Sequence, residues 1–269
     1  MANIRSKVNE LYSLEQLSSG KTLIHKIHPL VKIITTMVFI ITVVSFDRYN
    51  LQGLVPFVFY PVVIMSLGEI PFAMVFKRTL IALPFCVFAG VSNIIFDREI
   101  LVEIGDIGIS YGVVSFFAII LRTLLCVSAA LILVGITPFT QLAGQLRRCY
   151  VPGILVTMFE MTYRYIGVFA DEVVSMYTAY GLRHSQGVGV EMKDMGTFVG
   201  QLLLRSFDRA ERIYGAMMCK NYASAERNLP KKKLLLRDWI YLIIVSGLCI
   251  IFRVISVSDI YTSLMGGII

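Results

Sequence analysis

The stretch VVSFFAIILRTLLCVSAALILVGI, which covers Val113–Ile136, decides the class of this protein. Its side chains are almost all apolar, and Arg122 is the single charged residue within it. A helix needs about 20 mostly apolar residues, at about 1.5 Å per residue, to cross the roughly 30 Å hydrocarbon core of a bilayer. This stretch is therefore predicted to be a transmembrane helix.

The composition of the whole chain agrees with a membrane protein. Of the 269 residues, 57% are hydrophobic and 16% are charged, whereas a soluble domain has about 25% charged residues. Prolines are expected to distort two of the spans, at Pro56, Pro61 and Pro84. We predict an all-α, polytopic integral membrane protein with about five transmembrane helices. The four further apolar stretches are Leu30–Phe46, Leu51–Leu67, Leu80–Phe96 and Trp239–Val257.

Charged residues in the loops predict the orientation of these spans. Lysine and arginine precede the first span and follow the second, where they are Lys77 and Arg78, while the loop after the third span is rich in acidic residues. Because basic loops stay on the cytoplasmic side, we expect a cytoplasmic N-terminus. The chain then divides into a cytoplasmic N-terminal segment (1–29), four transmembrane helices (30–136), a cytoplasmic region (137–238) and a last transmembrane helix with an external C-terminus (239–269).

The region 137–238 has the pattern of long amphipathic helices. Apolar residues recur every three or four positions over 154–182 and again over 192–220, with charged residues on the opposite face. A break is expected at 187–189, and a shorter helix over 141–150 precedes both. Two helices of this length have more apolar surface than they can bury against each other. We therefore expect them to pack on the membrane surface or on a partner protein as well.

Both long helices are predicted to end in a cation followed by small or polar residues. Leu182, Arg183 and His184 close the first helix, and Cys219, Lys220 and Asn221 close the second. A cation in this position complements the helix dipole, and it can equally be a contact for a partner protein. The residues alone leave both interpretations open.

No catalytic group or metal site stands out in the sequence. Ser19-Gly20-Lys21-Thr22 resembles the end of a phosphate-binding P-loop, but Glu15 occupies the position of its first glycine. His25 and His28 have the spacing of metal ligands on a helix, and no third ligand lies beside them in the sequence. We therefore predict no enzyme activity, no cofactor and no metal site.

Arg122 is the exception in an otherwise apolar span. An unpaired cation near the middle of a membrane costs at least about 2.5–3.5 kcal/mol, so we expect a partner or a water-filled position between helices. Such a residue favours a transport-related role. The alternative is a structural arginine that binds backbone carbonyls within the helix bundle.

Four segments together carry a resemblance to a known family. They are His28-Pro29-Leu30-Val31-Lys32 before the first span, Thr137-Pro138-Phe139 after the fourth, Tyr163-Arg164-Tyr165, and Arg205-Ser206-Phe207 through Ala216-Met217. The first resembles the D-P-R-x-K entry, and the others resemble the cytoplasmic region, of the T component of energy-coupling factor (ECF) transporters. Within that EcfT/CbiQ family the chain is most similar to the cobalt/nickel-type CbiQ subunits.

The resemblance implies a non-catalytic scaffold with two coupling helices, in a multi-pass protein of the prokaryotic cell membrane. It implies as partners two ABC-type ATPase subunits, whose grooves take the helix ends, and a substrate-binding membrane subunit (an S component or a CbiM-like protein). The family ends each coupling helix in an alanine-arginine-glycine-like signature. Arg183 matches this arginine at the end of the first coupling helix. At the end of the second, Lys220 stands in its place and lacks the guanidinium group, which can form two parallel hydrogen bonds. Cobalt ions are the expected cargo.

Three alternatives remain. A shared T component that serves vitamin uptake is the alternative within the class. An integral membrane enzyme acting on lipids would rest on Glu69 or Glu160 alone. A basic surface for nucleic acid or anionic lipid would use Lys231–Lys233, but that run is explained more simply as a positive-inside anchor beside the last span. We therefore expect contact with the lipid bilayer and no nucleic acid partner.

Overall fold

The computed structural model describes residues 20, 22–47, 51–96, 100–104, 107–149, 151–183, 190–221 and 234–254. The chain forms two compact units. Gln16–Pro138 and Lys233–Ile269 make up one, here called the membrane unit, and Phe139–Lys232 with Met1–Glu15 make up the other, here called the long-helix unit.

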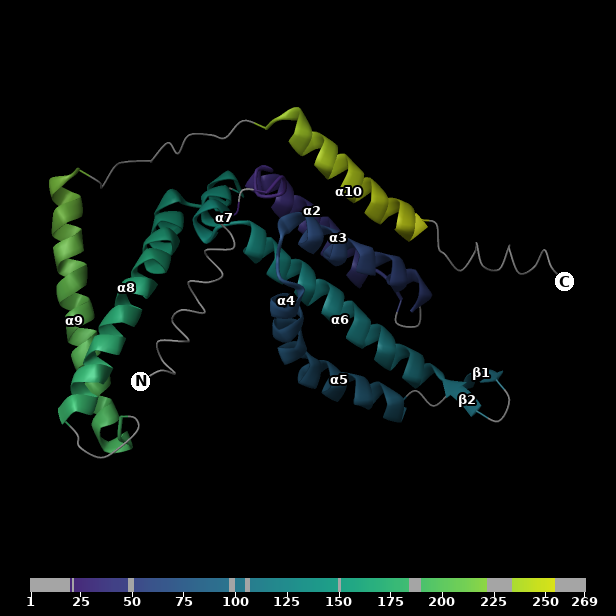
Figure 1. Ribbon diagram of the computed structural model, residues 1–269, viewed down its shortest axis with the longest axis horizontal. Coiled ribbons are helices and arrows are strands. Elements are labelled where there is room, and N and C mark those ends of the chain that lie inside the picture. Colours follow the sequence, from purple (N-terminus) through teal and green to yellow (C-terminus); the bar gives the residue numbers. More distant parts are fainter. Residues whose placement is uncertain are drawn as a thin grey trace. The chain divides into compact units, whose positions relative to one another are not determined.

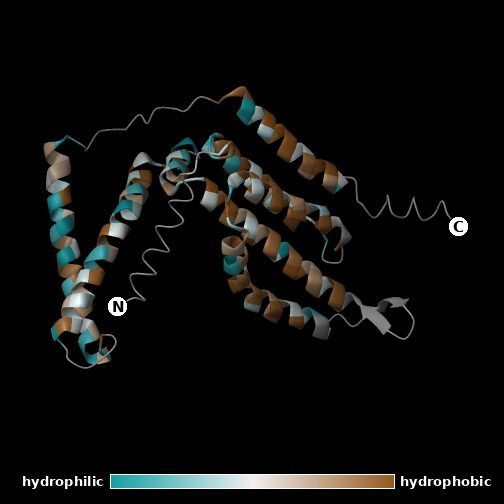
Figure 2. Cartoon of the chain, in the orientation of Figure 1, coloured by the Kyte–Doolittle hydropathy of each residue, from teal (hydrophilic) through white to brown (hydrophobic). Residues whose placement is uncertain are grey.

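The membrane unit is built from apolar helices, which appear brown in Figure 2. In chain order (Figure 1) the elements are α2 (Pro29–Val44), the 3-10 helix η1 (Gln52–Val58), α3 (Phe59–Gly68), α4 (Phe72–Thr79), the 3-10 turn η2 (Leu80–Ala82), α5 (Leu83–Phe96), β1 (Ile100–Ile104), β2 (Ile107–Ser110), α6 (Tyr111–Ile136) and α10 (Leu236–Val254). The strands β1 and β2 form a two-stranded antiparallel hairpin between α5 and α6, with Ile104 opposite Ile107.

Two helical runs of the described chain are both long and apolar enough to cross a bilayer, Phe72–Asn93 and Gly112–Ile136. The runs Pro29–Val44 and Gly53–Gly68 are apolar but shorter. Helix α10 has 19 residues, and its charges lie close to its two ends. Apart from the small hairpin, the protein is thus the all-α membrane protein that its sequence predicts.

The third predicted span begins earlier than expected. A helical run starts at Phe72 rather than at Leu80, so Lys77 and Arg78 lie within α4 and not in a loop. Helix α4 is amphipathic, with Val75 buried and Lys77 exposed. A search for continuous apolar residues therefore misses it. Both cations still lie at the same end of the third span.

All three prolines lie within or just after a 3-10 stretch of the helices. Pro56 lies within the 3-10 helix η1, and the 3-10 turn η2 comes just before Pro84, so the predicted distortions occur at these two positions. Pro61 is the third residue of α3, which directly follows η1, so a change from 3-10 to α-helical backbone lies just before this proline as well.

The core of the membrane unit lies where α2, α6 and α10 meet η1. Phe39 and Val43 of α2 are fully buried there with Leu54 of η1. Helices α5 and α6 also pack closely, since a Cβ atom added at Gly90 would lie 2.5 Å from the ring of Phe116. Small residues allow helices in membranes to approach each other in this way.

The long-helix unit consists of a short helical segment followed by two long helices. The first helix is α7 (Phe139–Leu146), which the 3-10 turn η3 (Arg147–Cys149) extends. It packs on the long helix α8 (Gly153–Arg183) through Phe139 and Tyr163, whose rings stack with centroids 4.3 Å apart. The second long helix is α9 (Met192–Cys219). The predicted helices over 154–182 and 192–220 are confirmed within one residue at each end, while the break predicted at 187–189 lies outside the described residues.

We expect the substitution Gly90→Leu to disrupt the contact between α5 and α6. The larger side chain would displace the ring of Phe116, and overpacking of this kind costs about 1–3 kcal/mol. The melting temperature of the purified protein in detergent should fall accordingly. Gly247→Leu in α10 is the matched control, because nothing lies within 4 Å of a Cβ atom there. An equal fall in the control would contradict a specific role for Gly90.

Candidate functional site

The end of α8 is exposed on the long-helix unit. Leu182 has 78% of its surface accessible, and Arg183 beside it is exposed in the last turn. The cation complements the carbonyl end of the helix dipole, and its guanidinium group can also contact a partner. His184, the third residue of this predicted docking end, lies outside the described residues.

A backbone hydrogen bond caps the C-terminal end of α9. Asn221 adopts a left-handed conformation with φ of 51°, and its N–H donates to the carbonyl of Met218 at 3.0 Å. Asparagine is, after glycine, the residue that most often ends a helix in this way. Cys219, Lys220 and Asn221 are all exposed. The asparagine therefore permits the same chain reversal that a glycine would permit, and Lys220 remains accessible just before it.

Polar contacts hold α8 and α9 together along part of their length. Glu172 of α8 accepts hydrogen bonds from Arg205 and, at 3.4 Å, from Arg209 of α9. Nearer the connection of the two helices, the Tyr180 hydroxyl donates to Asp194 at 2.7 Å. This hydrogen bond, together with partial desolvation, raises the pKa of Tyr180 above its usual value, so the contact persists at neutral pH.

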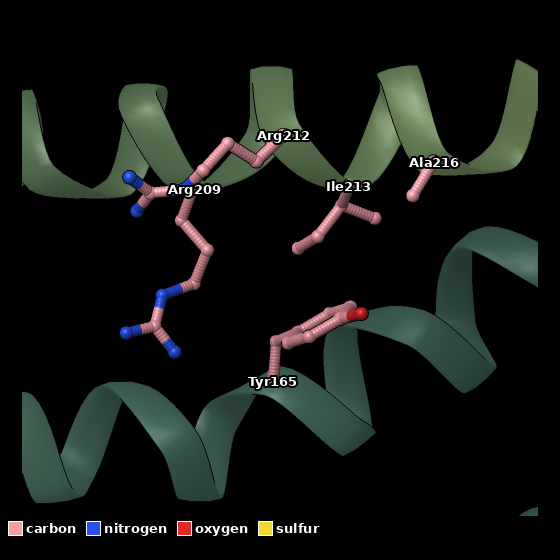
Figure 3. A pocket seen from close by; sticks show the side chains of 5 residues that line it. All are labelled: Tyr165, Arg209, Arg212, Ile213 and Ala216. Atoms are coloured by element: carbon pink, nitrogen blue, oxygen red, sulfur yellow. The ribbon is translucent and has the colours of Figure 1, made fainter.

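Beyond these contacts the two helices enclose an open cleft of about 300 Å³. Figure 3 shows the ring of Tyr165 on α8 facing Ile213 of α9, with Arg209 reaching across from α9 toward α8. Arg212 and Ala216 complete the lining. The cleft is lined by an aromatic ring and by cationic groups. Part of the facing sides of α8 and α9 therefore remains accessible.

Helix α9 also carries an apolar stripe that the described residues of the long-helix unit leave uncovered. No residue of α9 is buried, although α9 has large apolar side chains at helical spacing. An uncovered apolar stripe of this length marks a surface that contacts another protein or lipid. Its members, each with more than half of its surface accessible, are Val199, Leu203, Phe207, Tyr214 and Met218.

In the membrane unit, Arg122 of α6 binds the end of α2. Its Nη2 donates to the carbonyl of Phe46 at 2.6 Å and to that of Asp47 at 3.1 Å. Arg253 of α10 donates to the neighbouring carbonyl of Ser45 at 3.1 Å and lies over the ring of Phe46. Two guanidinium groups from two helices thus pair carbonyls that follow the last turn of α2. This geometry corresponds to the carbonyl-binding interpretation of Arg122.

Lys32 binds the opposite end of the same helix group. It is 1% exposed, and its Nζ donates to the carbonyl of Ile136 at 2.9 Å and to that of His25 at 3.3 Å. Ile136 is the last residue of α6. A buried cation at the carbonyl end of a helix pairs an otherwise unsatisfied group and complements the dipole.

Asp238 is a buried anion at the amide ends of two helices, α2 and α10. It is 1% exposed and is the third residue of α10. One carboxylate oxygen accepts from the N–H of Leu235, just before α10, at 2.9 Å. The other accepts from the N–H of His28, the N-cap residue of α2, at 3.0 Å. One carboxylate therefore caps the N-termini of two helices, where a negative charge is favourable.

The two histidines of the entry segment take part in local contacts. His28 Nδ1 accepts from the N–H of Leu30 at 3.1 Å, and His25 Nδ1 lies 2.6 Å from the Thr22 hydroxyl. Over the part of the chain that the structure describes, no group of three histidine, cysteine, aspartate or glutamate residues is arranged to hold a metal ion.

Sequence reasoning missed the roles of Lys32, Asp238 and Arg253. A signal was present, since each is a charged residue within a few positions of the end of an apolar span. In a membrane such residues usually pair with each other or with backbone carbonyls. The sequence does not say which carbonyl each one reaches.

We expect Arg122→Met to destabilise the membrane unit. The substitution keeps an apolar stem but leaves the carbonyls of Phe46 and Asp47 without their donor, and a hydrogen bond to a charged group contributes about 1.5–3 kcal/mol. The melting temperature in detergent should fall relative to the wild type and to Lys77→Met, which changes an exposed cation. A melting temperature equal to that of the control would show that Arg122 does not support α2.

Comparison with known proteins places this chain in a family. Residues 20–231 match the family of the cobalt transport protein CbiQ. The matched range includes the buried Lys32, both long helices and the two exposed helix ends. The Asp238 carboxylate and helix α10 lie beyond the match.

Individual relatives agree with this match. An uncharacterized protein of Methanocaldococcus jannaschii is 24% identical over 91% of this chain and 88% of its own length. The "Energy-coupling factor transporter transmembrane protein EcfT" of Ruminiclostridium cellulolyticum is 25% identical over 89% of this chain and 94% of its own. The "Cobalt transport protein CbiQ" of Rhodobacter capsulatus is 28% identical over 49% and 56%. Because the family match covers more than half of the chain, the protein belongs to the CbiQ family of cobalt transport proteins.

Proposed function

We propose that this chain is the transmembrane scaffold subunit of an ECF-type importer. Two ABC-type ATPase subunits bind the ends of α8 and α9 from the cytoplasm, and a separate membrane subunit binds the cargo. The chain converts the closure of the ATPases into a movement of its membrane helices. It catalyses no reaction itself, because ATP hydrolysis takes place in the partner subunits.

The observation that carries this proposal is the exposure of both long helices and of their cationic ends. Arg183 and Lys220 are exposed, and no residue of α9 is buried within the chain. A soluble protein would not leave two helices of 31 and 28 residues with this much apolar surface uncovered. Partner subunits account for both features, since they would cover the apolar stripe of α9 and pair with the two cations.

The orientation of the chain follows from its charges. Lys77 and Arg78 lie at the start of the third span, and more than half of the 25 lysine and arginine residues lie in 137–238. Under the positive-inside rule both places are cytoplasmic. The long-helix unit and the N-terminus then face the side on which ATP is available.

Cobalt ions are the cargo that we propose. The description of the family and the name of the Rhodobacter capsulatus relative both refer to cobalt transport. In this scheme the metal is bound by the partner membrane subunit, so this chain needs no metal site of its own.

A shared module for several vitamin-binding subunits is the second candidate. It is favoured by the relative of Ruminiclostridium cellulolyticum, which carries the more general name of an ECF transmembrane protein and aligns over 94% of its length. The two candidates share the same coupling helices and differ in the membrane partner.

Charge reversal at the helix ends tests the docking. We expect Arg183→Glu and Lys220→Glu each to reduce co-purification of the ATPase subunits at least tenfold, because each places a carboxylate where a cation is needed. Lys220→Arg should strengthen the association, since it restores a bidentate guanidinium group. The measurement is the amount of ATPase recovered with the tagged chain from solubilised membranes.

The controls are Arg164→Glu on α8 and Arg212→Glu on α9, which reverse exposed cations away from the helix ends. Undiminished ATPase recovery with both end variants would refute docking at these ends. Equal losses in the controls would mean that the net charge of the helices matters and not the position of the cation.

Uptake measurements test the cargo. Cells that express this chain with its ATPase and membrane partners should accumulate radiolabelled Co²⁺, and Arg183→Glu should abolish the accumulation while the protein still inserts into the membrane. Uptake of a vitamin in place of Co²⁺ by the same cells would favour the shared module.

A further inference from the structure

The part of the long-helix unit that contains α7, α8 and α9, Phe139–Lys232, is joined to the membrane unit at both of its ends. The chain leaves the membrane unit after α6, through Thr137 and Pro138, and it returns through the residues before α10. Any movement of α8 and α9 that reaches the membrane helices through the backbone passes these two crossings. What holds the crossings therefore matters for the proposed function, on which this inference rests.

The exit crossing is held by Lys32. Its Nζ donates to the carbonyl of Ile136, the last residue before Thr137. Thr137 is itself fully buried, and its hydroxyl has no hydrogen-bond partner among the described residues. The bond from Lys32 thus pairs the carbonyl at the point where the chain leaves α6.

The return crossing is held by the residues at the start of α2. Asp238 accepts from the N–H of His28 at 3.0 Å and from that of Leu235 at 2.9 Å. Arg237 donates to the carbonyl of Lys26 at 3.2 Å. Two bonds therefore join residues 26–28 to the first turn of α10.

One short segment, residues 25–32, makes the contacts to Ile136, Arg237 and Asp238. Lys32 also donates to the carbonyl of His25 at 3.3 Å, so the exit bond and the return bonds are linked within the segment. Lys32, His28 and Asp238 are each 1% exposed, so water does not compete for the bonds from Lys32 to Ile136 and from His28 to Asp238. The bond between Arg237 and Lys26 joins two exposed residues. The segment is small and is bonded to both crossings, with one buried bond at each.

We propose that residues 25–32 are the anchor at which both ends of the long-helix unit are held, with Lys32 and Asp238 as its positioning residues. Because the two crossings share one anchor, a pull on α8 and a pull on α9 both act on the start of α2. The anchor thereby converts the movement of two helices into one displacement of the membrane helices. Without it, the crossings would yield locally and ATP hydrolysis would proceed without transport.

Amide hydrogen exchange on the full-length protein in lipid nanodiscs tests the anchor directly. Lys32→Met should speed exchange at residues 134–140 at least tenfold, because the carbonyl of Ile136 loses its donor. Asp238→Ala should do so at His28 and Leu235, whose N–H groups lose their acceptor. Lys32→Arg, which keeps a cation, should recover most of the protection, and Lys77→Met should change nothing. Exchange within twofold of the wild type in both anchor variants would overturn the proposal.

The second measurement uses the complex with its ATPases. Lys32→Met should lower transport per ATP hydrolysed at least tenfold, while recovery of the ATPases stays within twofold of the wild type. Asp238→Asn, which keeps the shape of the side chain, is the variant to use if Lys32→Met gives too little protein. Full transport in a variant whose exchange is accelerated would overturn the positioning role. A wild-type chain that recovers no ATPase would instead refute the proposed function, and the exchange result would still decide the anchor.

Discussion

The membrane unit depends on the pairing of the backbone N–H and carbonyl groups at its helix ends. In an apolar environment these groups must find hydrogen-bond partners. The first N–H groups and the last carbonyls of a helix have no partner within the helix, and water is scarce near a bilayer core. Here the partners are charged side chains from neighbouring helices. Asp238 caps the start of α2, Arg122 and Arg253 pair the carbonyls at its end, and Lys32 pairs the last carbonyl of α6.

These contacts are reciprocal, so each helix orders the others. Helix α2 gives Lys32 to α6 and receives Arg122 from it, while α10 contributes both Asp238 and Arg253 to the two ends of α2. Each cation contacts a carbonyl end and the anion contacts amide ends, so every charge complements the dipole of the helix end that it contacts. The result is a group of three helices held at both ends, with the aromatic core around Phe39 between them.

The long-helix unit is held in a different way. Its helices are joined by a few polar contacts, at Glu172 and at Tyr180, and an open cleft separates them near Tyr165. Surface ion pairs contribute little to stability. The length and stiffness of α8 and α9 suit a role as levers, and their uncovered apolar side chains leave a surface for partners. The two units thus differ in how they are held: buried contacts hold the helix ends of the membrane unit, whereas a few polar contacts join the helices of the long-helix unit.

Much of this architecture could be predicted from the sequence, because hydrophobic periodicity and length depend on local residues. The all-α membrane class, the ends of α8 and α9 and the extent of α6 follow from runs of apolar residues and from their spacing. The start of the third span was misplaced, since α4 is amphipathic and a continuous apolar run begins only after it.

The partners of the buried charges were decided by tertiary structure alone. Lys32 and Ile136 are 104 positions apart, and His28 and Asp238 are 210 apart, so no local pattern connects them. The sequence by itself determined which segments are helices and which ends carry charge, because both depend on neighbouring residues. Only the packing of α2, α6 and α10 decided which helix end each charge reaches, because a hydrogen bond requires the two groups to meet within about 3 Å.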